Sequence, residues 1–151
     1  MRPNLVVSKE VILLVEDDPA DAELTRRSLK KNNLCNELVV AHDGQEALDY
    51  LFGTGAYQGR DTSVMPQIIL LDLGLPKVSG LEVLERVRSE ERTSRLPVVV
   101  LTASAQEQDL VESYAHGTNA YVRKPVEFGE LHEAVRQLGL SWLVLNETSE
   151  S

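Results

Sequence analysis

The stretch QIILLDLGLPKVSG, residues 67–80, places a single acid between an aliphatic run and a turn. Residues 68–71 are aliphatic without alternation, which is typical of a parallel strand covered by helices on both faces. Asp72 follows this run directly, and Gly74 and Pro76 then break the strand. The stretch therefore predicts a strand at the centre of a parallel sheet, which carries one carboxylate to the point where the strand ends.

Aliphatic runs of the same kind recur along the chain and alternate with segments of helical spacing. A strict alternation of strand and helix with short links is typical of an open parallel sheet with helices on both faces. We therefore expect a doubly wound α/β fold. The expected strands are residues 11–16, 37–41, 67–72, 97–102 and 120–124, and the expected helices are residues 18–33, 43–52, 79–90, 105–117 and 127–139.

The composition of the 151 residues bounds the functions that this protein can have. Hydrophobic residues make up 42% and charged residues 26%, the balance of a globular protein with a buried core. The formal net charge of −9 makes nucleic acid an unfavourable partner, because that affinity comes from clustered lysine and arginine. The chain has a single cysteine, Cys35, and no recognisable signal peptide, so we expect the protein in the cytoplasm. No apolar run is long enough to span a membrane.

The ends of the chain and one internal segment differ from the rest in composition. We expect a flexible N-terminus over residues 1–8, a folded domain over residues 9–138 and a C-terminal extension over residues 139–151. Residues 53–66 are rich in glycine and polar groups and too long for an ordinary link, which predicts a mobile or partner-facing loop. Trp142 in the extension is equally compatible with capping the domain's own core and with anchoring a partner.

The residues that follow the strands are polar, and ligands of doubly wound sheets bind at these carboxyl ends. If the sheet places the first strand beside the third, three carboxylates converge. Two unit charges about 4 Å apart repel by roughly 4 kcal/mol at a dielectric constant near 20, so the three acids need a counter-charge. Mg²⁺, which prefers oxygen ligands, and a lysine supply it. The residues concerned are Glu16, Asp17, Asp72, Thr102 and Lys124.

Such a site with a metal ion and a lysine is suited to phosphate chemistry. A carboxylate there can attack phosphorus and form an acyl phosphate, because the cation and the ammonium neutralise the charge on the phosphoryl oxygens. Asp72 is the expected nucleophile, since it stands alone at a central strand end, whereas Glu16 and Asp17 are suited to metal binding. Thr102 would offer its hydroxyl to one phosphoryl oxygen and Lys124 its ammonium to another.

Other polar residues have simpler interpretations. Asp18 precedes a proline at the start of a helical segment and is expected to cap that helix. His42, His116 and His132 lie in three separate segments without the spacing of metal ligands, so we interpret them as surface residues.

Four motifs follow one another along the chain: LLVEDD (13–18), LLDLGLPKVSG (70–80), LTA (101–103) and YVRKP (121–125). Together they resemble the receiver domain of bacterial two-component response regulators. The resemblance covers residues 11–138 and implies the flavodoxin-like fold, a five-stranded parallel sheet with strand order 2-1-3-4-5. It also implies that Asp72 accepts a phosphoryl group from a phosphohistidine on a sensor histidine kinase.

The resemblance implies specific roles around Asp72. It implies Mg²⁺ bound by Asp17, Asp72 and the backbone carbonyl of Gly74, with Glu16 reaching the metal through water. It also implies a cis peptide bond between Lys124 and the following proline, despite the ordinary trans preference.

Thr102 and Tyr121 resemble the pair of residues that switches in this family. The hydroxyl of Thr102 would move toward the phosphoryl group while the ring of Tyr121 turns inward. This change would reshape the face formed by helix 105–117, strand 120–124 and helix 127–139, as a population shift biased by the phosphoryl group.

The chain resembles a stand-alone receiver, because no output domain follows. Its long loop over residues 53–66 and its ending, FGELHEAVRQLGLSWLVL (128–145), resemble the subfamily that serves phytochrome-type histidine kinases. Members often pair through the switching face and the C-terminal extension. We therefore expect a homodimer with Trp142 at its interface.

The sequence departs from the usual family pattern at four positions. Gly74 stands where many members carry a side chain such as Asn, and Ser104 is also small, so the lifetime of the phosphoryl group depends on two positions that flank the path of attacking water. Val126 replaces a commoner aromatic residue, and Glu16 stands where Asp is frequent.

Two rival functions remain open beside a phosphoacceptor that signals without turning over a substrate. The first is a phosphohydrolase that forms an aspartyl-phosphate, although such enzymes normally carry a second acid at the position of Gly74. The second is an unphosphorylated scaffold, although all the expected site residues are present.

Overall fold

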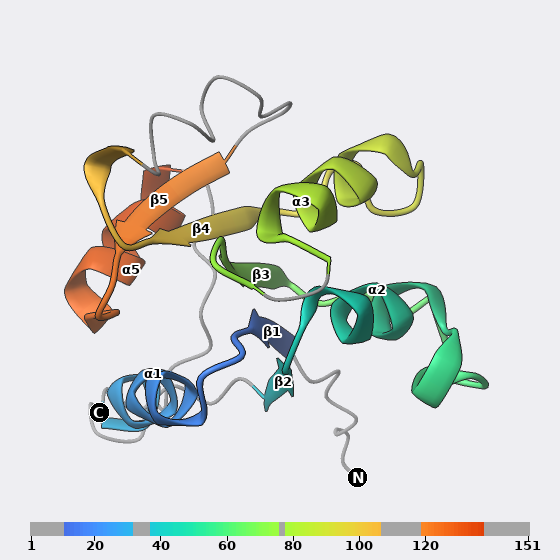
Figure 1. Ribbon diagram of the computed structural model, residues 1–151, viewed down its shortest axis with the longest axis horizontal. Coiled ribbons are helices and arrows are strands. Elements are labelled where there is room, and N and C mark those ends of the chain that lie inside the picture. The colour runs from blue at the N-terminus through green and yellow to red at the C-terminus, as the bar shows by residue number, and fades with distance from the viewer. Residues whose placement is uncertain (1–10, 32–36, 76–77, 107–118, 138–151) are drawn as a thin grey trace, which may run out of the picture.

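One sheet of five parallel strands organises the protein in the computed structural model, which describes residues 11–31, 37–75, 78–106 and 119–137. The strand order is β2-β1-β3-β4-β5 (Figure 1), which confirms the expected doubly wound sheet. The strands are β1 (Val11–Val15), β2 (Glu37–Ala41), β3 (Ile68–Asp72), β4 (Val98–Thr102) and β5 (Asn119–Arg123).

Helices cover both faces of the sheet. Figure 1 shows α1 (Pro19–Lys31) and α5 (Phe128–Gln137) on one face, and α2 (Gly44–Phe52) and α3 (Gly80–Ser89) on the other. The helix expected over residues 105–117 begins at residues 105–106, and the remainder lies outside the described residues. Within the described ranges, no helix is both long enough and apolar enough to cross a lipid bilayer.

The core lies on both sides of the sheet. All side chains of β1, β3 and β4 are buried, as their unbroken aliphatic runs predict. Because successive residues of a strand point to opposite faces, they alternate between two clusters. In β3, Ile69 and Leu71 pack with the residues of α2 and α3, whereas Ile68 and Leu70 pack with those of α1 and α5.

Local signals set the starts of the helices. Asp18 Oδ1 accepts a hydrogen bond of 2.8 Å from the backbone N–H of Ala20, which confirms Asp18 as a cap of α1. Asp43 accepts from Glu46 N at 2.8 Å before α2. Ser79 forms a reciprocal capping box with the third residue of α3.

The loop between α2 and β3 makes specific contacts with α2. It contains the short 3-10 helix η1 (Gly55–Tyr57), and Arg60 fastens it to α2. Arg60 Nε donates to Tyr50 O at 2.6 Å, the guanidinium lies 4.1 Å from the centre of the Tyr50 ring, and Arg60 Nη1 donates to Val64 O at 2.8 Å. These contacts hold part of the loop against α2. The mobile or partner-facing character expected of residues 53–66 stays a prediction.

Candidate functional site

The register of the sheet brings the polar strand ends together. Val15 of β1 pairs with Leu71 of β3, so Glu16 and Asp72, one residue further along each strand, end side by side. Lys124 follows β5 directly, and its backbone N–H donates to Thr102 O at 2.8 Å, which continues the pairing with β4. The expected site therefore forms at one edge of the sheet, where the carboxyl ends of parallel strands meet.

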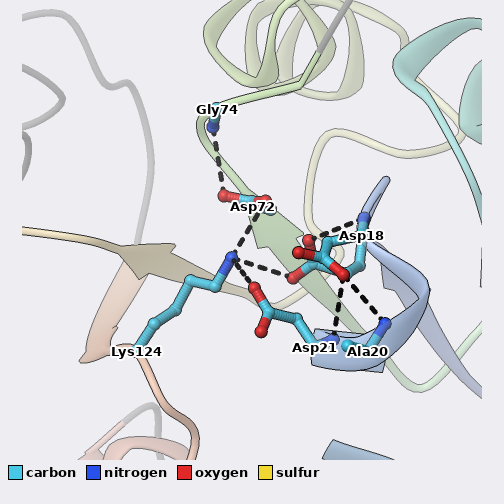
Figure 2. Close-up of polar contacts among 7 residues, drawn as sticks. Asp18, Ala20, Asp21, Asp72, Gly74 and Lys124 are labelled. Atoms are coloured by element: carbon cyan, nitrogen blue, oxygen red, sulfur yellow. Dashed lines mark hydrogen bonds and ion pairs between the residues drawn. The ribbon is translucent and has the colours of Figure 1, made fainter. Parts of the chain in front are cut away.

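Three carboxylates gather at this edge. Ligand oxygens of Glu16, Asp17 and Asp72 all lie within 4.8 Å of one another. Glu16 and Asp72 are buried, with 1% and 6% of their surface exposed, whereas Asp17 is open to solvent. The backbone N–H of Gly74 donates to Asp72 Oδ1 at 3.0 Å, which holds one carboxylate oxygen in place (Figure 2).

This donor set fits a hard divalent cation. Mg²⁺ takes oxygen ligands in a compact octahedron and keeps several waters, so a site with one solvent-facing acid suits it. Glu16 Oε1 is buried and accepts no hydrogen bond among the described residues, although the ammonium of Lys124 lies 3.1 Å from it, so this oxygen can contribute to a cation site next to the other two acids. A cation bound by this cluster would reduce the repulsion among its charges.

Lys124 points its ammonium into the acidic cluster. Its Nζ lies 3.2 Å from Asp72 Oδ2 and 3.1 Å from Glu16 Oε1, although the second contact is not aligned as a hydrogen bond. The following peptide bond, to Pro125, is cis, as the resemblance implies. A third acid, Asp21 of α1, has its Oδ2 3.1 Å from the same ammonium (Figure 2).

Sequence reasoning missed Asp21. An acid in the first turn of a helix usually complements the positive end of the helix dipole, and Asp21 stands in that turn of α1. Nothing in its neighbourhood in the sequence points to a lysine that follows a distant strand. Only the packing of α1 on the sheet brings the two residues together.

The ionisable groups of the site shift each other's protonation. Burial, together with the hydrogen bond and negative charge of Asp72, raises the pKa of Glu16 from 4.5 to about 7. Burial by itself would lower the pKa of Lys124, but its contacts with Glu16, Asp21 and Asp72 outweigh burial and raise this pKa above its ordinary value. Lys124 is therefore a permanent cation beside the acids.

Of the two expected switch residues, Thr102 ends β4 at the carboxyl end of the sheet, and Tyr121 lies within β5. Thr102, at the end of β4, is fully buried, and its Oγ1 has no hydrogen-bond partner among the described residues. Tyr121 of β5 is half-buried and packs against the cluster formed with α2 and α3. An orphaned buried hydroxyl costs free energy unless a ligand satisfies it, so Thr102 is suited to donate to a bound group.

Other expected residues lie away from the site or outside the described ranges. His42 and His132 are exposed, and the ring of His132 stacks on Phe128. Trp142, His116 and Cys35 lie outside the described residues.

The chain is similar to known proteins over most of its length. A family model described as "Response regulator receiver domain" matches residues 12–136. The solved structure of the bacteriophytochrome response regulator AtBRR is 53% identical, with a TM-score of 0.86, and the match covers 93% of this chain and 100% of that one.

Two cyanobacterial proteins are also similar. The response regulator Rcp1 of Synechocystis sp. is 40% identical over 89% of each chain, and its solved Mn²⁺-bound form aligns with a TM-score of 0.68. The phosphorylated cyanobacterial phytochrome response regulator RcpA is 37% identical, with a TM-score of 0.68, over 87% of this chain and 91% of that one.

Proposed function

Because the chain belongs to the response regulator receiver family, we propose that Asp72 accepts a phosphoryl group from the phosphohistidine of a sensor histidine kinase. The observation that carries this proposal is the position of Asp72, buried at the end of a central strand, with Lys124 Nζ 3.2 Å from its Oδ2 and two further acids beside it. The phosphorylation of RcpA supports the same chemistry here.

In the proposed step, a carboxylate oxygen of Asp72 forms a bond to phosphorus while the bond from phosphorus to the donor's imidazole nitrogen breaks. The nitrogen keeps the electron pair of that bond. Lys124 donates to one phosphoryl oxygen and the Thr102 hydroxyl to another, so both neutralise charge as it develops. No proton is needed on Asp72, which reacts as a carboxylate.

Mg²⁺ is the proposed cofactor. The ion would be held by Asp17, Asp72 and the backbone carbonyl of Gly74, with Glu16 acting through a water molecule. When bound, it would neutralise negative charge on the phosphoryl oxygens. The Mn²⁺-bound form of Rcp1, a similar protein, supports the binding of a divalent cation by this protein.

The proposed output is a change of shape rather than turnover of a substrate. Thr102 and Tyr121 would move together when the phosphoryl group arrives, which would alter the face formed by β5, α5 and the helix that begins at residue 105. The protein would then act as a signalling module with slow self-dephosphorylation, and not as a conventional enzyme.

A phytochrome-type histidine kinase is the proposed donor, acting in the cytoplasm. The similarity to AtBRR over 93% of the chain supports this choice, because that protein is a bacteriophytochrome response regulator. We propose the receiver domain over residues 9–138, between an N-terminal segment of residues 1–8 and an extension of residues 139–151.

A homodimer is proposed through β5, α5, the helix that begins at residue 105 and the extension, with Trp142 as an anchor. Among the described residues, β5 and α5 border a groove of about 420 Å³ that includes Tyr121, Arg123 and Glu130. A groove with both apolar and charged walls is suited to a partner's side chains.

Incubation with acetyl phosphate and Mg²⁺, followed by intact mass measurement, tests the central proposal. We expect an adduct of roughly 80 Da, the mass of one phosphoryl group, which Asp72→Asn abolishes. Glu85→Gln, which removes an exposed acid from α3, should keep the adduct. Absence of an adduct on the unmodified protein would favour an unphosphorylated scaffold, whereas steady hydrolysis of phosphomonoesters would favour a phosphohydrolase.

The donor is tested by replacing acetyl phosphate with autophosphorylated kinases of the source organism. We expect the phytochrome-type kinase to transfer its label faster than the others. Equal or slower transfer from that kinase would refute the choice of donor and leave Asp72 as the acceptor.

A further inference from the structure

Asp21 contacts Lys124 but is not one of the acids that form the proposed metal site. Lys124 Nζ contacts three carboxylates at nearly equal distances, 3.1 Å for Glu16, 3.1 Å for Asp21 and 3.2 Å for Asp72. Glu16 and Asp72 also belong to the cluster whose oxygens lie within 4.8 Å of one another, and Asp21 does not. Glu16 and Asp72 therefore contact Lys124 and also belong to the acid cluster, whereas Asp21 contacts Lys124 from outside that cluster.

Asp21 is held in place by the start of α1. Asp18 Oδ1 accepts from Ala20 N at 2.8 Å and from Asp21 N at 3.4 Å, which fixes the first turn of the helix (Figure 2). The Asp21 side chain is 38% exposed, whereas that of Glu16 is 1% exposed, so Asp21 stands at the solvent-facing rim of the site. Its contact with Lys124 links α1 to the end of β5.

Phosphorylation would change the negative charge that the three acids present to Lys124. An ammonium has three N–H donors, and here three carboxylates surround it. When Asp72 carries a phosphoryl group and a cation draws on Glu16 and Asp72, the negative charge that these two acids present to Lys124 falls. Asp21 lies outside that acid cluster, so it stays available to Lys124.

We propose that Asp21 is a positioning residue for phosphotransfer, which holds the ammonium of Lys124 beside Asp72 while the other two acids are engaged. The inference rests on the proposed function of Asp72. Asp21 acts through Lys124 and touches no reacting atom. With one N–H directed to Asp21, the ammonium still has two donors for the phosphoryl oxygens.

The rate of phosphorylation by acetyl phosphate at saturating Mg²⁺ tests this role. Asp21→Asn keeps the shape of the side chain and removes its charge. We expect this variant to react about three- to tenfold more slowly, the loss expected for one partly exposed charged contact. Asp21→Glu, which restores the charge, should recover most of the rate.

Two measurements separate positioning from other effects. The dissociation constant for Mg²⁺ should change by less than about twofold in Asp21→Asn, because a charge that is not a ligand acts through screening solvent. Glu23→Gln removes an equal charge from the same helix, where Glu23 pairs with Arg26 and Arg27, and should react like the unmodified protein.

A double-mutant cycle identifies the residue through which Asp21 acts. We expect Asp21→Asn to have no further effect in a Lys124→Ala background, since the group that it positions is gone. The inference is overturned if Asp21→Asn reacts as fast as the unmodified protein, if it weakens Mg²⁺ binding in proportion to the rate, or if it slows the Lys124→Ala variant equally. Those results leave the proposed function intact, whereas an unmodified protein that takes no phosphoryl group overturns both.

Discussion

Glu16 is a carboxylic acid with 1% of its surface exposed, next to a second carboxylate on the neighbouring strand. Burial and the charge of Asp72 favour its neutral form, which raises its pKa to about 7. Lys124 opposes this effect but shares its charge among three acids. A bound cation would favour the ionised form of Glu16, so proton and metal compete for this site.

The stability of the metal-free protein should therefore depend on pH through Glu16. The ordinary pKa of a glutamate side chain is 4.5 and that of Glu16 in the fold is about 7, so the folded state binds the proton more tightly. The stability gained is fully present below about pH 4.5 and is lost as the pH rises through about 7, with a magnitude on the order of 3 kcal/mol at most. Urea unfolding in EDTA between pH 5 and 8 measures this loss.

Glu16→Gln provides the matched comparison, because its side chain is neutral at every pH. We expect a flatter pH profile for this variant, and Glu23→Gln on the exposed side of α1 should keep the slope of the unmodified protein. Added Mg²⁺ should restore stability mainly above pH 7, where Glu16 is ionised. Equal slopes for the unmodified protein and Glu16→Gln would show that Glu16 does not cause the pH dependence of stability.

At the scale of the elements, the start of α3 lies against the end of β3. A Cβ atom at Gly80 would lie 2.5 Å from the carbonyl oxygen of Asp72 and 2.7 Å from Cα of Leu73. The absence of a side chain at Gly80 therefore lets α3 begin directly beside the strand end that carries Asp72. Both neighbouring atoms belong to the backbone, so they cannot move aside cheaply.

Gly80→Ala should destabilise the protein by about 1–3 kcal/mol, because the added methyl group overpacks a backbone contact. Gly129→Ala in α5 is the matched control, since no atom lies within 4 Å of its added Cβ. It should stabilise the protein by about 0.4–1 kcal/mol through the entropy of the unfolded chain. Urea unfolding midpoints compare the two, and equal shifts would show that the contact at Gly80 is not tight.

At the scale of the molecule, the two helical layers differ in what they support. Successive residues of β3 point to opposite faces of the sheet, so Asp72 points to the face that is covered by α1 and α5. Helix α1 also adds Asp21 to the site. The layer of α2 and α3 packs on the other face, together with Tyr121. The face of β5 and α5 therefore lies close to the site that would change it, which suits a phosphorylation-dependent interface.

Light scattering at high micromolar concentration tests the proposed homodimer. We expect the mass of a dimer, with and without beryllofluoride as a phosphate mimic, and a lower mass for a folded Trp142→Ala variant. The reason is that a large aromatic side chain in an interface removes roughly 150–250 Å² from water. A monomeric mass under both conditions would count against the dimer.

The sequence by itself determined the five strands, their alternation with helices and the polar residues that end them. Strands and helix caps arise from interactions over a few residues, so aliphatic runs and Asp18 before a proline were sufficient to predict them. The resemblance to the receiver family added the strand order, and the order placed Glu16 and Asp72 together. The sequence also predicted that Lys124 stands at the same edge.

Only the tertiary structure decided which further groups meet at these positions. The contact of Asp21 with Lys124 depends on how α1 packs across the sheet, and the anchoring of residues 53–66 depends on Arg60 reaching back to α2. The raised pKa of Glu16 likewise follows from burial beside Asp72. Each of these contacts joins residues from different elements, so its energy depends on distance and dielectric surroundings, which no short stretch of sequence contains.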